Sequence, residues 1–116
     1  MDASHTEATA LNREAALARM GGDQELLHEI ALLFLEEYPS ALQNLRKAVE
    51  TRDSLVIEHT AHTLKGSVLN FGAEAAAEAA SRLEILGRTR KTVEFPGALE
   101  TLEAAMVKVQ AELVAL

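Results

Sequence analysis

Helix-forming residues run through the whole of this sequence, and only two prolines interrupt them. Alanine, leucine and glutamate, which rank among the best helix formers, recur along the chain from the first residues to the last. No segment shows the sustained two-residue alternation of apolar and polar side chains that marks a half-buried β-strand. The sequence therefore predicts an all-α protein without a β-sheet.

Capping residues and stop signals divide the chain into a series of helices. The expected helices begin at or directly after these positions: Asn12, Asp23, Ser40, Ser54, Gly72 and Pro96. The second is expected to end before Pro39, because the residue that precedes a proline avoids the helical region. The helix after Gly72 is expected to stop near Gly87, and a loop is expected over residues 88–95.

The last expected helix carries apolar residues three and four apart, which is the pattern of a bundle seam. These residues are Leu99, Leu102, Met106, Val109 and Leu113. Long helices with short connections pack antiparallel, so we expect an antiparallel up-down four-helix bundle with a short additional N-terminal helix. The 116 residues fit one domain, expected over residues 11–116 behind a flexible N-terminal tail over residues 1–10.

Charge and composition argue against several classes of protein. The net charge of −7 and the aromatic content of 3% disfavour nucleic acid binding, which needs a basic face or stacking platforms. The absence of cysteine excludes disulfides and thiolate metal sites. The chain starts without a secretory signal, and no apolar run reaches the length of a membrane span. We therefore expect a cytoplasmic protein that does not bind membranes.

The segment AHTLKGSVLNFGA, residues 61–73, places a histidine, a lysine and a glycine inside an expected helix. The core stripe of that helix follows the same three-and-four spacing: Ile57, Ala61, Leu64, Val68 and Phe71. His62 stands one residue past the stripe, and Lys65, Gly66 and Leu69 follow it at three, four and seven residues. These spacings put the four residues on one face. They predict a surface patch in which a nucleophilic nitrogen stands beside a cation and a gap for a partner's backbone.

Spacing alone does not assign a function to this patch. An exposed histidine on a helix is usually plain polar surface, and a glycine can reflect close helix packing. A metal site is a further alternative, because Glu58 and His59 precede His62 on the same helix. Metal-binding bundles draw ligands from several helices, however, and Glu25 and His28 form an E-x-x-H pair without a second one. No metal and no cofactor are therefore expected.

Several acidic residues are expected to be ordinary surface. The glutamates expected on solvated faces are Glu36, Glu37, Glu74, Glu78, Glu84 and Glu103. Arg82 stands four residues after Glu78, a spacing that favours a weak ion pair between them. We assign no function to these side chains from their spacing.

The six residues HTLKGS at 62–67, with Asn70, Gly72 and Ala73 behind them, resemble the signature of histidine-containing phosphotransfer domains. Further segments are similar to other parts of that family: residues 17–38, residues 45–53 and the Leu83-Glu84 pair. The first resembles the family's opening helix pair, the second the lead-in to the histidine helix, and the third a pair on the next helix. The resemblance thus covers nearly the whole chain.

This resemblance implies a phosphohistidine carrier in a multistep two-component phosphorelay. By this likeness, His62 accepts a phosphoryl group from a receiver-domain aspartate and passes it to another receiver. Lys65 is expected to offset the phosphate charge, and Gly66 to leave room for the receiver. The full set of expected phosphate-site and docking neighbours is Lys65, Gly66, Ser67, His59 and Leu69.

The partners implied by the resemblance are receiver domains of response regulators or of a hybrid sensor histidine kinase. The carrier is expected to act as a monomer. The sequence contains neither G-x-x-x-x-G-K-[ST] nor G-x-G-x-x-G, so no ATP site is expected and the chain is not expected to be an enzyme by itself. The catalytic groups and the metal are expected from the receiver. The alternative is a non-transferring interaction module on the same bundle fold.

Overall fold

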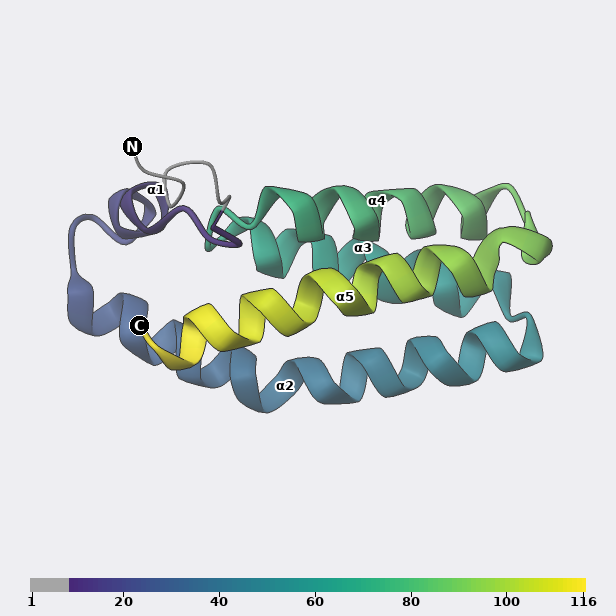
Figure 1. Ribbon diagram of the computed structural model, residues 1–116, viewed down its shortest axis with the longest axis horizontal. Coiled ribbons are helices and arrows are strands. Elements are labelled where there is room, and N and C mark those ends of the chain that lie inside the picture. Colours follow the sequence, from purple (N-terminus) through teal and green to yellow (C-terminus); the bar gives the residue numbers. More distant parts are fainter. Residues whose placement is uncertain (1–8) are drawn as a thin grey trace, which may run out of the picture.

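Helices account for all the regular structure of residues 9–116, the part of the chain that the computed structural model describes (Figure 1). They are α1 (Arg13–Arg19), α2 (Gln24–Thr51), α3 (Ser54–Leu69), α4 (Glu74–Arg88), the 3-10 helix η2 (Thr92–Glu94) and α5 (Phe95–Val114). No strand occurs within residues 9–116, so the all-α prediction is confirmed for them. Residues 1–8 of the expected tail lie outside the described residues.

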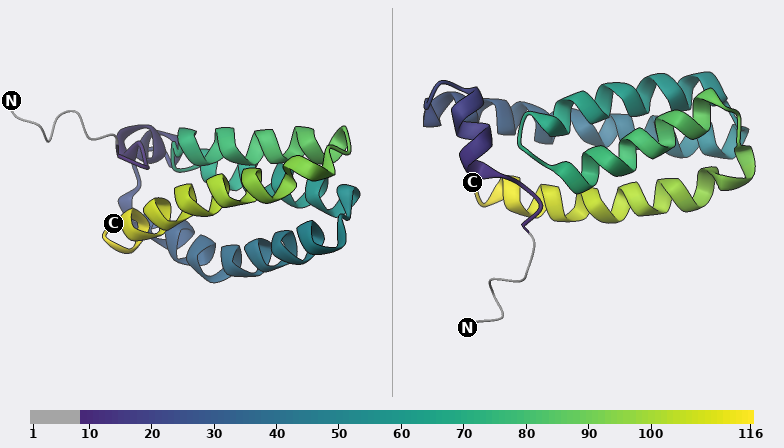
Figure 2. Two further views of the ribbon diagram at one scale, coloured as in Figure 1. Left: turned by 45° about the vertical axis from the view of Figure 1, so that its right-hand side comes forward. Right: turned by 90° about the horizontal axis from the view of Figure 1, so that it is seen from above.

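The long helices α2 to α5 lie lengthwise beside one another, and α1 lies at the end where α2 begins (Figures 1 and 2). The core lies between these helices, and its largest fully buried side chains are Phe71, Phe95, Leu45, Ile57, Leu83, Leu102, Met106, Val68 and Val109. Ahead of α1, the N–H groups of Ala10 and Leu11 donate to the Glu112 carboxylate on α5, at 2.6 and 3.0 Å. None of the helices in residues 9–116 has the length and apolar character needed to cross a membrane.

Pro39 lies inside α2, which corrects the expectation that one helix ends before it and another starts at Ser40. Proline in a helix interior costs about 3 kcal/mol, because it removes a backbone hydrogen bond and its ring clashes with the preceding turn. The buried side of α2 continues on both sides of the proline: Leu27, Ala31, Phe34, Tyr38, Leu42, Leu45 and Ala48. Each large apolar side chain that becomes buried contributes about 1.5–3 kcal/mol, so this stripe outweighs the local cost.

Short polar side chains start the helices that position the site. The Asp23 carboxylate accepts the Leu26 N–H at 3.0 Å, which confirms the expected cap of α2. At α3 the cap is Asp53 rather than Ser54, and it accepts the Val56 N–H at 3.2 Å. Gly72 adopts the expected left-handed conformation, with φ of 65°, in the turn from α3 to α4. The two caps fix where α2 and α3 begin, and the turn at Gly72 precedes α4.

The packing of α4 on α3 explains Gly87 differently from the sequence interpretation. The expected end of this helix near Gly87 is confirmed, because α4 ends at Arg88, but Gly87 itself is buried inside the helix. A Cβ atom on Gly87 would lie 2.8 Å from the Glu58 backbone nitrogen and 2.9 Å from the Ser54 carbonyl oxygen. The backbones of the two helices therefore approach each other closely at this point because residue 87 has no side chain.

The segment expected as a loop over residues 88–95 is largely helical. Arg88 closes α4, η2 covers residues 92–94, and Phe95 is fully buried at the first position of α5. Pro96 occupies the first turn of α5, as expected, where its missing N–H has no helical partner to lose. The seam predicted for this helix is confirmed, since these residues are buried: Leu99, Leu102, Met106, Val109 and Leu113.

Candidate functional site

His62 lies on α3 at the edge of the helix surface that packs into the core. The predicted stripe is confirmed, because Ile57, Ala61, Leu64 and Val68 are at most 3% exposed. The His62 side chain, one residue past Ala61, is 66% exposed. An imidazole in this position reaches solvent while its helix is held rigidly by the core.

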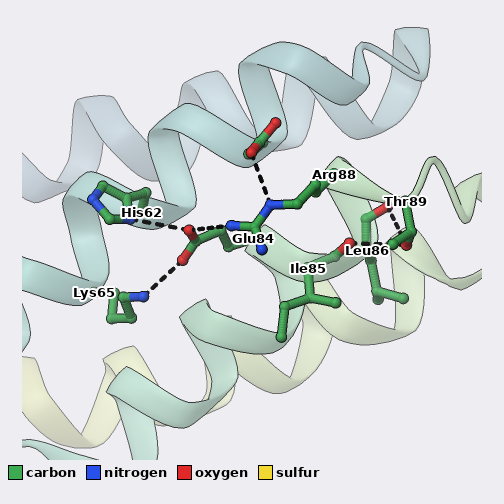
Figure 3. Close-up of polar contacts among 8 residues, drawn as sticks. His62, Lys65, Glu84, Ile85, Leu86, Arg88 and Thr89 are labelled. Carbon is green, nitrogen blue, oxygen red and sulfur yellow. Dashed lines mark hydrogen bonds and ion pairs between the residues drawn. The ribbon is translucent and has the colours of Figure 1, made fainter.

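A buried carboxylate on the neighbouring helix is bonded to Nδ1 of the His62 imidazole. Glu84 of α4 has a side chain that is 7% exposed, and its Oε2 lies 3.0 Å from Nδ1 of His62 (Figure 3). Nζ of Lys65 donates to Oε1 of the same carboxylate at 2.8 Å. His62 and Lys65, one turn apart on α3, therefore share a single carboxylate on α4.

The ionisation of Glu84 decides which nitrogen of His62 carries the proton. The hydrogen bond from Lys65 lowers the pKa of Glu84, burial opposes this shift, and the bond with His62 adds to the lowering. The net shift is downward, so the carboxylate is ionised at neutral pH and can only accept hydrogen bonds. Nδ1 of His62 must then donate its proton to Glu84. In the neutral ring, this tautomer leaves the lone pair on Nε2.

Arg88 extends this network toward the end of α4. Its Nη2 donates to Oε2 of Glu84 at 2.8 Å (Figure 3). Its Nε donates to Oε2 of Glu58 at 3.1 Å. Glu58 lies on α3, four residues before His62. Polar contacts thus connect α3 and α4 on both sides of the Glu84 carboxylate.

The residues that follow Lys65 form an open surface. A Cβ atom on Gly66 would meet nothing within 4 Å, and Leu69 is 37% exposed. Lys65 and Leu69 also line a shallow groove between α3 and α4. The Ser67 hydroxyl donates to the Thr63 carbonyl at 3.2 Å, so it is engaged on its own helix.

The two histidines of α3 differ in their surroundings. His59 is exposed, and none of the hydrogen bonds made by Glu84 involves it, whereas His62 is bonded to that carboxylate. The described residues contain no group of three or more His, Cys, Asp or Glu side chains that could hold a metal ion. The site is therefore an exposed imidazole with a fixed tautomer, beside two cations.

Sequence reasoning from spacing missed Glu84, which it placed among the solvated glutamates. The signal was present, because Glu84 follows the buried residues Ala77 and Ala80 by seven and four residues on α4. That spacing puts it on the face that meets α3. The expected ion pair of Arg82 with Glu78 was also wrong, because Nη2 of Arg82 bonds to Oε1 of Glu94 at 3.1 Å.

Comparisons with known proteins identify the family and the fold of the chain. The family model of the Hpt domain matches residues 29–112, which is more than half of the chain. The crystal structure of histidine-containing phosphotransfer protein B (HptB) from Pseudomonas aeruginosa PAO1 is similar, with a TM-score of 0.86 at 22% identity. The match covers 94% of this chain and 95% of that one, and at this identity it shows the shared fold. A search among curated proteins gave no match.

Proposed function

The chain belongs to the Hpt domain family, and on that premise we propose that His62 is the residue that carries the phosphoryl group. Hpt domains are phosphotransfer carriers of two-component signalling that interact with receiver domains and have no catalytic site of their own. The observation that carries the assignment to His62 is its bond to the ionised Glu84. This bond leaves a lone pair on Nε2, on a side chain that is 66% exposed.

The proposed reaction is a displacement at phosphorus. Nε2 attacks the aspartyl phosphate of a receiver, an N–P bond forms, and the P–O bond to the aspartate breaks, which returns a free carboxylate. The ring keeps its Nδ1 proton and becomes cationic, and the ionised Glu84 stabilises that charge. Attack by the aspartate of a second receiver reverses these bonds and completes a receiver-to-receiver relay.

The neighbours of His62 suit this reaction. The transition state of phosphoryl transfer is loose, so positioning and charge supply most of the catalysis. We assign to Lys65, one turn from His62 and 28% exposed, the role of offsetting the phosphate charge. The open space at Gly66 and the exposed Leu69 offer the receiver a close approach and an apolar contact. Ser67 and His59 contribute the edges of this surface, and the metal is supplied by the receiver.

A transfer assay tests the assignment of His62. Receiver domains are charged with a small phosphodonor and Mg²⁺, then mixed with the chain, and acid-labile phosphate is followed by intact mass and phosphate-affinity gel. Wild type and His59→Gln are expected to gain one phosphoryl group, and His62→Gln none. His59→Gln is the matched control, because it removes an exposed imidazole from the same helix. Label on His62→Gln would overturn the assignment, and no label from a broad receiver panel would favour the non-transferring interaction module.

We also propose how the whole domain is built and works. Short connections join α2 to α3, α3 to α4 and α4 to α5, which favours an antiparallel up-down four-helix bundle with α1 as an additional N-terminal helix. We assign this domain to residues 11–116 and the tail to residues 1–10.

The carrier acts as a monomer in the cytoplasm, beside its receivers. Light scattering coupled to size-exclusion chromatography tests the monomer, and a stable dimer would contradict it.

A further inference from the structure

Arg88 joins the two helices of the site through two different carboxylates. Nη2 donates to Glu84 on its own helix at 2.8 Å, and Nε donates to Glu58 on α3 at 3.1 Å. Arg88 lies outside the HTLKGS segment, and its side chain is 55% exposed. Because its side chain is half exposed and bonded at two of its nitrogens, Arg88 orients its two carboxylate partners and does not fill the core.

The carboxylate of Glu84 needs more than one donor to keep its orientation. Its Oε1 accepts from Lys65, and its Oε2 is shared by Nδ1 of His62 and Nη2 of Arg88. The terminal torsion of a glutamate is broad, so a carboxylate held by Lys65 alone can rotate. Rotation would carry Oε2 away from His62. Arg88 opposes this rotation from the side opposite Lys65 (Figure 3).

Glu58 holds Arg88 in turn. The guanidinium is planar, with its donors in a fixed fork, so a bond at Nε constrains the direction of Nη2. Glu58 is 26% exposed and stands one turn before His62 on α3. The contacts therefore run from α3 through Arg88 and Glu84 and return to α3 at His62.

We propose that Arg88, aimed by Glu58, is a positioning residue that keeps Oε2 of Glu84 on Nδ1 of His62 and so keeps the lone pair of the ring on Nε2. This inference rests on the proposed function for its consequence in phosphoryl transfer, but the tautomer itself can be measured without any transfer. Loss of Arg88 is expected to let the Nε2–H tautomer form, in which the exposed nitrogen has no lone pair to attack with.

The test combines nitrogen NMR of the imidazole with the transfer assay. The full chain is labelled with ¹⁵N and studied at about pH 8.5, above the ordinary histidine range, where nitrogen shifts report the tautomer. Arg88→Gln is expected to raise the share of the Nε2–H tautomer of His62 and to slow phosphoryl acceptance roughly three- to tenfold. Glu58→Gln is expected to change both in the same direction, to a smaller extent.

Arg82→Gln is the matched control. Arg82 lies on the same helix, has a similarly exposed side chain (63%) and pairs with Glu94, away from the site. It is expected to leave the tautomer and the transfer rate at their wild-type values. An unchanged His62 tautomer in Arg88→Gln overturns the inference, even if transfer slows, because Arg88 then acts on docking instead. If wild type itself accepts no phosphate, the proposed function fails, and the tautomer comparison still decides the role of Arg88.

Discussion

Gly66 and Gly87 are both glycines within helices of the α3–α4 pair, yet their surroundings are opposite. At Gly87 an added Cβ atom would lie 2.8 and 2.9 Å from backbone atoms of α3. At Gly66 it would meet nothing within 4 Å. A glycine inside a helix costs about 1 kcal/mol relative to alanine, so each position needs a reason for its residue.

The packed glycine is explained within the chain, and the open one is not. Gly87 allows α4 to approach α3 closely, beside the segment that carries Glu58. No contact within residues 9–116 uses the space above Gly66. Its cost is therefore not explained by packing among these residues, and the proposed docking of a receiver at Gly66 would account for it. A methyl group added at Gly87 should therefore lower the stability of the chain, and one added at Gly66 should raise it.

The largest expected change is the destabilisation caused by Gly87→Ala. The new methyl group would collide with the α3 backbone, which cannot move as a flexible side chain can. Overpacking typically costs about 1–3 kcal/mol, so we expect a net loss of about 2 kcal/mol in the free energy of unfolding. Urea denaturation measures it. Gly97→Ala, at a helical position with nothing within 4 Å, is the control and should not destabilise the chain. An equal effect at both positions would remove the distinction between packed and open glycines.

The second prediction concerns Glu84, which lies between the two glycines on the α3–α4 contact. Glu84→Gln keeps the shape of the side chain but removes the charge that accepts from Lys65 and Arg88. Hydrogen bonds to a charged group contribute modestly when the partner is partly exposed to solvent. We therefore expect the free energy of unfolding to fall by about 1–2 kcal/mol at pH 7. Urea denaturation of both proteins gives this difference.

The acid dependence of that difference has a definite sign. Lys65 holds the pKa of Glu84 below its ordinary value of 4.5 in the folded chain. The stabilisation is therefore fully present above that value and is lost as the pH falls through the lowered pKa. The gap between wild type and Glu84→Gln should close in acid. Glu78→Gln, on an exposed position of the same helix, should show no such gap. A gap that stays constant with pH would mean that the ionised carboxylate is not its source.

The third prediction reverses the sign of the stability change. Gly66→Ala is expected to stabilise the isolated chain by about 0.5–1 kcal/mol, because alanine is the better helix former and nothing opposes its methyl group. The rate at which the chain accepts a phosphoryl group from a phosphorylated receiver is expected to fall, since the methyl group occupies the space left for the partner. Denaturation and the transfer assay are run on the same preparation. Undiminished transfer would show that the open space at Gly66 is not used in docking.

The helical fold and the position of His62 could be predicted because both follow from short-range spacing. The three-and-four repeats of α3 and α5 place buried and exposed side chains without knowledge of any partner helix. Pro39 could not be predicted in this way. Its local preference ends a helix, and only the burial of α2 on both sides of it overrides that preference.

The burial of Glu84 and the packing of Gly87 against α3 were not predicted, for a related reason. Both are decided by the contact between α3 and α4, which spacing along one helix does not specify. A glutamate is rarely buried unless it is paired, and its partners His62 and Lys65 stand on another helix. Similarly, Gly87 resembles a stop signal until the α3 backbone lies against it. The exposed half of the site was thus visible in the sequence, while its buried half needed the tertiary structure.

The smallest expected effect is that of Ser67→Ala. This substitution tests whether any change on this turn of α3 affects transfer, or only one that fills the open space at Gly66. The Ser67 hydroxyl donates to the Thr63 carbonyl, four residues earlier on the same helix. Such bonds add little to a helix, so alanine should change the free energy of unfolding by at most about 0.5 kcal/mol, in the stabilising direction. Transfer should stay within about twofold of wild type, because this hydroxyl is already engaged on its own helix. Gly66→Ala and Ser67→Ala then form a pair of neighbouring substitutions that both favour the helix, the second less than the first, and that are expected to differ in their effect on transfer. If both slow transfer equally, the turn as a whole contacts the receiver, and the missing side chain of Gly66 has no special part in docking.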